Sequence, residues 1–269
     1  MSYLIIECGS SARGDTNPSS DIDRVCIWEA PPNISSIEKE FGPVMFYSLE
    51  TIKKMRAKGS LFLTHLDIDS IYISGNKDLM RFYKGYRPSK IQVRKLLDDT
   101  INFIASIKWY PNTPLGKLWL CDVLYVSIRS CIYCKNALNE RYTFGYESAL
   151  KELGLNKDIY ATMLKIREGK YAYRKKVIPN NIWTDIKYIE NACRDILKHP
   201  IEFKNGGVTN WQGTWRKDYW GERLIERAII NNEHADDLFM QRITQHNYNK
   251  FKLKCSISEI INMHTSNKH

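Results

Sequence analysis

Apolar residues near the start of the chain come in short runs that end at glycine, proline or polar residues, which is the pattern of buried strands. Ser48 follows one of these runs and is placed to cap a helix over residues 49–58, which Gly59 closes. The expected strands cover residues 3–6, 21–28, 43–48 and 71–73. These elements predict a small mixed sheet with helices at the N-terminus.

From residue 89 onward the apolar positions recur at helical spacing instead, and Pro, Gly or Asn separate the segments. The expected helices cover residues 91–109, 115–140, 146–153, 158–176 and 182–198. Arg87 and Pro88 lie between the two patterns. We therefore predict an α+β protein with a mixed-sheet domain at residues 1–88 and an all-helical domain at residues 89–269.

The polar residues at the end of the first expected strand and at the start of the second are candidates for an active site. After the first strand comes Gly-Ser-Ser-Ala-Arg-Gly at residues 9–14, where the glycine permits a sharp turn into a short helix whose first N–H groups suit a phosphate. Asp21 and Asp23 lie two residues apart on the second strand, so both carboxylates are expected on the same face. Carboxylates beside a phosphate are the surroundings that Mg²⁺ prefers, and together they indicate metal-assisted nucleotidyl transfer.

The pattern Gly-Ser-x-Ala-Arg-Gly, a polar spacer and then Ser-Asp-Ile-Asp resembles the signature of the DNA polymerase β-like nucleotidyltransferase superfamily, in particular its small prokaryotic branch. The resemblance implies a nucleoside triphosphate held at the first half of the motif and two Mg²⁺ (or Mn²⁺) ions held by Asp21 and Asp23. The nucleotide-binding residues that it implies are Gly9, Ser10, Arg13 and Ser20.

A third carboxylate is usual in this superfamily, on the strand that follows the paired aspartates, but residues 44–48 contain no acid. The run that starts at Ser60 resembles a Ser-Leu-Phe, His-Leu and acid pattern of the same branch, in which Asp69 takes the place of the acid. We therefore expect Asp69, in preference to Asp67, to complete the catalytic and metal-binding set. A site with only two carboxylates is the alternative. His65 is expected to pack against the sheet.

Composition changes the picture through charge. The chain has 269 residues and a net charge of +10, of which residues 1–90 carry only +1 and the remainder +9. A basic second part suits a polyanionic acceptor or product such as tRNA, DNA or an oligonucleotide. No apolar run is long enough to span a membrane, so we expect a soluble, cytoplasmic protein. The seven cysteines are expected to be reduced thiols buried in helices, and Cys131 and Cys134 to be packing residues and not a zinc site.

Two further patterns in the second part have a functional and a packing interpretation. Arg194 and His199 match the spacing of HEPN ribonucleases, although the end of a basic helix explains them as well. Residues 211–223 mix aromatic and basic side chains, which can stack on bases or anchor the segment to the helices. We favour the packing interpretation of both.

These observations predict a metal-dependent nucleotidyltransferase that moves a nucleoside monophosphate from an NTP or dNTP to a hydroxyl of nucleic acid or of a growing oligonucleotide. That activity suits a bacterial defence or toxin-antitoxin system. The alternatives are nucleotidylation of a small molecule or a protein, a HEPN-type ribonuclease, and a catalytically inactive nucleotide-binding module. The sequence leaves the oligomeric state open.

Overall fold

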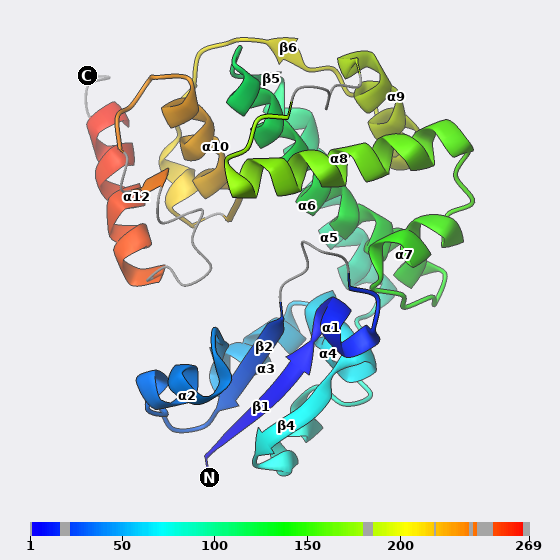
Figure 1. The fold of residues 1–269 in the computed structure, drawn as a ribbon, viewed down its shortest axis with the longest axis vertical. Coiled ribbons are helices and arrows are strands. Elements are labelled where there is room, and N and C mark those ends of the chain that lie inside the picture. Colours follow the sequence, from blue (N-terminus) through cyan, green and yellow to red (C-terminus); the bar gives the residue numbers. More distant parts are fainter. Residues whose placement is uncertain are drawn as a thin grey trace. The chain divides into compact units, whose positions relative to one another are not determined.

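A computed structural model describes residues 2–16, 22–179, 185–217, 219–236, 239–240 and 250–265. In its N-terminal part the strands are β1 (Tyr3–Cys8), β2 (Asp23–Trp28), β3 (Met45–Ser48) and β4 (Ile71–Gly75). The helices there are α1 (Gly9–Arg13), α2 (Ile34–Phe41), α3 (Leu49–Ala57), α4 (Leu61–Asp69) and the short 3-10 helix η1 (Lys77–Phe82). Figure 1 shows the strands as one sheet with helices around it.

The sheet has the order β3-β2-β1-β4 and is mixed. β1 pairs antiparallel with both β2 and β4, whereas β2 and β3 run parallel. The antiparallel register places Cys8, the last residue of β1, directly opposite Asp23, the first residue of β2. The turn that follows β1 and the start of β2 therefore lie at the same end of the sheet.

Apolar side chains alternate along β1 and form a core on each face of the sheet. Leu4, Ile6 and Cys8 belong to one core, which α3 and α4 close with Ile52 and Leu63. The opposite face has a smaller core, which contains Ile5, Cys26, Val44 and Ile37 of α2. Burial on both faces fixes which residues of each strand point to which side, because a shift of one residue would reverse every side chain.

The rest of the described chain is almost entirely helical, which confirms the predicted α+β class with a small mixed sheet followed by helices. The helices are α5 (Lys90–Ile107), α6 (Pro114–Leu138), α7 (Tyr146–Glu152), α8 (Lys157–Lys175), α9 (Ile186–Leu197), α10 (Tyr219–Ile230) and α12 (Lys250–Thr265), with a 3-10 turn η2 (Gly213–Lys217). Two short strands, β5 (Trp109–Tyr110) and β6 (Lys204–Asn205), pair in parallel. None of the helices in the described residues is long and apolar enough to cross a membrane.

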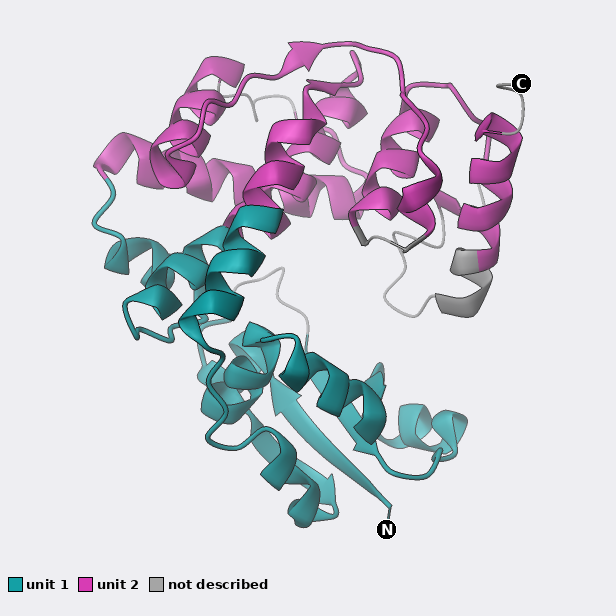
Figure 2. Cartoon of the chain, turned by 180° about the vertical axis from the view of Figure 1, so that it is seen from behind, with its two compact units in different colours: residues 1–99, 130–155 teal, residues 100–129, 156–269 magenta. Residues whose placement is uncertain are grey.

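The chain divides into two compact units, which Figure 2 shows in different colours. Unit 1 comprises residues 1–99 and 130–155, and unit 2 comprises residues 100–129 and 156–269. The first unit thus contains the sheet and also α7 with the C-terminal part of α6. The domains predicted at residues 1–88 and 89–269 remain a prediction based on pattern.

Some local expectations were wrong. The thiols are free in the structure, but Cys8 and Cys26 lie in strands and Cys255 is exposed, so the cysteines are not all buried in helices. The sequence pattern also gave no indication of α4 or α10 as helices. Ser48 does cap α3, because its side chain accepts a hydrogen bond from the Thr51 N–H.

Candidate active site

The turn after β1 lies directly against the carboxylate of Asp23. Gly9 has a φ of +80°, and a Cβ atom built on it would stand 2.8 Å from Oδ2 of Asp23. Real Cβ atoms essentially never stand that close, so any residue other than glycine would force the Asp23 carboxylate to move. Asp23 is exposed, which leaves its carboxylate accessible from solvent. The structure therefore brings together two residues that the motif separates by a spacer.

Asp23 also shares one face of the sheet with Cys8 and α4. Residues directly opposite each other in an antiparallel pair project from the same face, and Cys8 belongs to the core that α3 and α4 cover. Burial, together with the negative charges of Asp23 and Asp69, raises the pKa of the Cys8 thiol to about 12. The two predicted site carboxylates therefore act on the same buried group.

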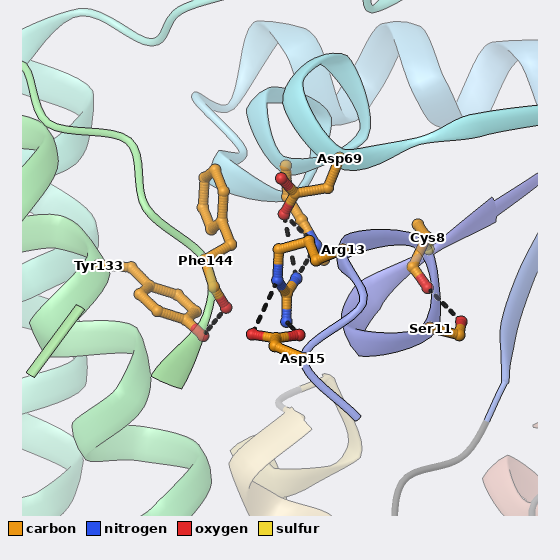
Figure 3. A network of polar contacts seen from close by, with 8 residues as sticks. Cys8, Ser11, Arg13, Asp15, Asp69, Tyr133 and Phe144 are labelled. Carbon is orange, nitrogen blue, oxygen red and sulfur yellow. Dashed lines mark hydrogen bonds and ion pairs between the residues drawn. The ribbon is translucent and has the colours of Figure 1, made fainter. Parts of the chain in front are cut away.

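Arg13, at the end of α1, lies between two carboxylates (Figure 3). Its Nη1 donates to Oδ2 of Asp69 at 3.0 Å, while its Nη2 is 3.1 Å from Oδ1 of Asp15 and its Nε donates to Oδ2 of Asp15 at 3.3 Å. The side chain of Asp69 is 8% exposed and that of Asp15 is 45% exposed. Arg13 thus joins a buried carboxylate to an exposed one.

His65 completes this network. Its Nε2 lies 3.1 Å from Oδ2 of Asp69 and 3.2 Å from Nη1 of Arg13. Burial acts to raise the pKa of the Asp69 carboxyl, but the hydrogen bonds and charges of His65 and Arg13 outweigh burial and hold that pKa below its usual value. Asp69 is therefore ionised in this arrangement near neutral pH.

The structure separates the two candidates for the third carboxylate. Asp67 accepts hydrogen bonds from the Gly85 N–H at 3.0 Å and from Nη1 of Arg87 at 2.6 Å, so it fastens the segment that follows η1. Asp69 faces Arg13 instead. Of the two, Asp69 is the one that contacts Arg13 of the motif, and its role in metal binding or catalysis stays a prediction.

Residues from α6 and from the loop before α7 lie against the same network, and the sequence gave no signal for them. The ring of Phe144 is 4.8 Å from that of His65, and Tyr133 donates to the carbonyl oxygen of Phe144 at 2.6 Å. A Cβ atom on Gly145 would stand 2.7 Å from Oδ2 of Asp15. His65 was expected to pack against the sheet; in the structure its ring lies beside that of Phe144, outside the sheet, and its Nε2 has polar partners.

Several motif residues cannot be placed. Asp21 and Ser20 lie outside the described residues, so the pairing of Asp21 with Asp23 on one face stays a prediction. Ser10 is partly buried in the first turn of α1. Within the described ranges, no group of three or more His, Cys, Asp or Glu side chains is arranged to hold a metal ion. The proposed metal site would need Asp21 for its completion.

The other candidate features serve packing in the described residues. Cys131 and Cys134 are buried in α6. Trp211 stacks on His264 with ring centres 3.9 Å apart, and Arg223 is buried in an ion pair with Asp122. The packing interpretation of residues 211–223 therefore accounts for these contacts.

The residues of the HEPN-like spacing lie at a helix end. Arg194 is in the last turn of α9 and donates to the side chain of Asn191, while His199 follows the end of the helix. This is the location that the helix-end interpretation expects.

Comparison with known proteins adds no further indication, since no protein-family model and no curated protein matches the chain. The candidate site therefore has to be judged on its geometry and on the motif.

Proposed function

We propose that this chain is a metal-dependent nucleotidyltransferase, which transfers a nucleoside monophosphate from an NTP or dNTP to a hydroxyl group. The observation that carries the proposal is the approach of Asp23 to Gly9, with 2.8 Å between Oδ2 and the place of a Cβ atom. A carboxylate beside a glycine turn offers an oxygen ligand to a cation that also binds a phosphate chain held at the turn. A structural turn alone would not need a charged side chain at this place.

The donor set suits Mg²⁺ or Mn²⁺. Asp23 is an exposed residue with a carboxylate, and Asp21, two residues earlier in the motif, would add a second carboxylate. Hard divalent cations bind such oxygens together with phosphate oxygens. When bound, the ions would stabilise negative charge on the attacking and leaving oxygens. Asp69 is the candidate for a third carboxylate and, in the structure, is held by Arg13 and His65.

The remaining residues would hold and orient the triphosphate. Ser10 and the backbone of Gly9 lie in the turn itself, and Arg13 is three residues from Ser10 on the same side of α1. In the reaction the acceptor oxygen forms a bond to the α-phosphorus, the bond from that phosphorus to the bridging oxygen breaks, and pyrophosphate leaves. The proton of the attacking hydroxyl passes to a carboxylate of the site or to water.

The charge distribution supports a nucleic acid or a growing oligonucleotide as acceptor. Residues 1–90 are nearly neutral, whereas the rest of the chain carries +9, which attracts a polyanion. We infer a role in defence or in a toxin-antitoxin pair from the same combination of a small transferase and a basic helical part. Small molecules and proteins are the acceptors to be tested against this one.

The test is incubation with each common ribonucleoside and deoxyribonucleoside triphosphate, with Mg²⁺ or Mn²⁺, in the presence of tRNA, DNA, short oligonucleotides, small hydroxyl compounds and the protein itself. Mass analysis of every product should show addition of a nucleoside monophosphate and release of pyrophosphate. Chelation by EDTA should abolish both. Absence of transfer to every acceptor with every nucleotide would overturn the proposal, and cleavage of RNA in EDTA would favour the ribonuclease.

A further inference from the structure

The contacts of Arg13 are divided between its two carboxylate partners. Asp15 takes Nη2 and Nε of the guanidinium, whereas Asp69 takes only Nη1. The interaction with Asp15 therefore fixes the plane of the guanidinium by itself, in the bidentate manner typical of arginine and carboxylate. The interaction with Asp69 is a separate bond that can break without loss of the other.

Two functions assigned to this pair compete with each other. Arg13 is expected to contact the phosphates, and Asp69 is expected to offer its carboxylate to a cation. In the structure Nη1 of Arg13 and Oδ2 of Asp69 are 3.0 Å apart and satisfy one another. As long as this bond exists, the charge of Nη1 is compensated by a carboxylate and is less available to a phosphate.

We propose that the triphosphate displaces Asp69 from Nη1 of Arg13. In the same step Arg13 binds the phosphates and the Asp69 carboxylate becomes available as the third carboxylate of the site. Arg13 is then a positioning residue that couples nucleotide binding to the release of Asp69. The inference rests on the proposed function and adds the order of events within it.

The surroundings of Asp69 allow it to leave Arg13 without a large loss of stability. Asp69 is 8% exposed, and a buried carboxylate that lost its only partner would be strongly destabilised. His65 prevents this, since its Nε2 is 3.1 Å from the same Oδ2 and can keep that contact when Arg13 leaves. The ring of His65 is itself held beside Phe144 and Phe62, with centroids 4.8 and 6.3 Å away.

The direct test measures binding of inorganic tripolyphosphate by calorimetry in the absence of metal. Asp69→Asn removes the competitor for Nη1 while leaving Asp15 in place, so we expect tripolyphosphate to bind about tenfold more tightly than to the wild type. Asp67→Asn is the matched control, because Asp67 lies on the same helix but faces Gly85 and Arg87. Its affinity should equal that of the wild type.

Arg13→Gln supplies the second half of a double-mutant cycle. We expect it to weaken tripolyphosphate binding and to cancel the gain, so that the Arg13→Gln, Asp69→Asn double variant binds no better than Arg13→Gln alone. Asp69→Ser, which has a smaller side chain, repeats the experiment in case the Asp69→Asn variant does not fold. A merely structural role of Asp69 would lower affinity in both Asp69 variants.

The exchange is refuted if the wild type binds tripolyphosphate and both Asp69 variants bind it no better, or if the gain survives in the double variant. Failure of the proposed function gives a different result. In that case the wild type transfers no nucleotide and none of the variants binds tripolyphosphate.

Discussion

Gly9 combines two constraints that can be separated by experiment. Its φ of +80° is a conformation that side chains rarely adopt, and a Cβ atom on it would also collide with Asp23. Gly14, at the other end of α1, has a φ of +76° but nothing within 4 Å of the place of its Cβ. The two glycines therefore share the backbone cost and differ in the contact with the carboxylate.

Gly14→Ala should cost about 1 kcal/mol of unfolding free energy, since only the backbone is strained. Gly9→Ala should have the same backbone cost and should also move the Asp23 carboxylate, which is expected to reduce nucleotidyl transfer about 100-fold. Urea unfolding and rates of pyrophosphate release measure the two effects. Equal transfer rates in the two variants would show that the approach of Asp23 to Gly9 has no part in the chemistry.

At this scale the sequence predicts residue types better than partners. Glycine in the motif indicated a turn, and the period of a strand predicted Asp21 and Asp23 on the same face. The pairing of Arg13 with Asp15 and Asp69 could not be predicted, because α4 brings Asp69 to the site from more than fifty residues away. Gly145 likewise reads as a simple helix boundary until its closeness to Asp15 is seen.

At the scale of elements, a buried ionic cluster joins three helices of unit 2. Asp122 of α6 is fully buried and contacts Arg174 of α8, with Nε 3.0 Å from Oδ1, and Arg223 of α10. Glu226 of α10 is fully buried as well and lies 2.8 Å from Nη1 of Arg223, while Tyr173 donates to its other oxygen. The charges compensate one another, so the removal of one leaves an excess of the opposite charge in the cluster.

Asp122→Asn should therefore lower the free energy of unfolding by about 3 kcal/mol or more, because two arginines lose their shared carboxylate. The control is Asp195→Asn, which removes an exposed pair with Lys198 in the same unit and should cost less than about 1 kcal/mol. Urea unfolding followed by circular dichroism measures both. Similar losses in the two variants would contradict a stabilising role of the cluster.

The C-terminal helix α12 is attached through a contact that depends on pH. His264 stacks on Trp211, and its Nε2 lies 3.2 Å from Nδ1 of His234. Burial lowers the pKa of His264, and the neighbouring His234 lowers it further, against a smaller opposite effect of Glu233. A hydrogen bond between two ring nitrogens also requires that one of them be unprotonated.

Because the folded state takes up the proton of His264 less readily than the unfolded state, its contribution to stability is complete above the ordinary histidine pKa of about 6.5 and is lost as pH falls toward the lowered folded value. The protection of the α12 amides against hydrogen exchange, corrected for the intrinsic slowing of exchange at lower pH, should therefore fall as pH is lowered from 7.5 to 5.5. His264→Gln should remove this dependence, and exchange in α9 serves as the internal control. A pH response that persists in His264→Gln would contradict the assignment.

Helices and strands with a clear periodic spacing of apolar residues could be predicted from the sequence. Elements whose conformation depends on tertiary contacts could not. The pattern predicted α8 at residues 158–176, and the structure has it at Lys157–Lys175. It gave no helix at residues 61–69, where Leu, Phe and Ile follow one another without a clear apolar face and burial against the sheet selects the helix. The two-residue strands β5 and β6 are too short for any period to appear.

For the whole molecule, the order of a mixed sheet followed by helices was evident from the change of period near residue 88. The division into compact units was not, since it depends on contacts such as that of Asn136, whose side chain donates to the carbonyl oxygen of Ala149 at 3.0 Å within unit 1. The spacing of apolar residues in the sequence does not show to which unit the C-terminal part of α6 belongs.

The excess positive charge and the nucleotidyltransferase-like motif lie in different parts of the sequence. The first 90 residues carry +1 and contain the proposed nucleotide site, while the rest carries +9. In our proposal the first part performs the transfer and the basic remainder attracts the acceptor. The central claim is that Asp23 and the Gly9 turn hold a nucleotide and a cation together.

That claim is tested most directly by titrating Mn²⁺ in the presence of a non-hydrolysable nucleoside triphosphate and following free Mn²⁺ by electron paramagnetic resonance. The account predicts nucleotide-dependent Mn²⁺ binding by the wild type and by Asp67→Asn, and binding at least about tenfold weaker in Asp23→Asn. Mn²⁺ binding of equal strength in all three proteins, or none in the wild type, would contradict it.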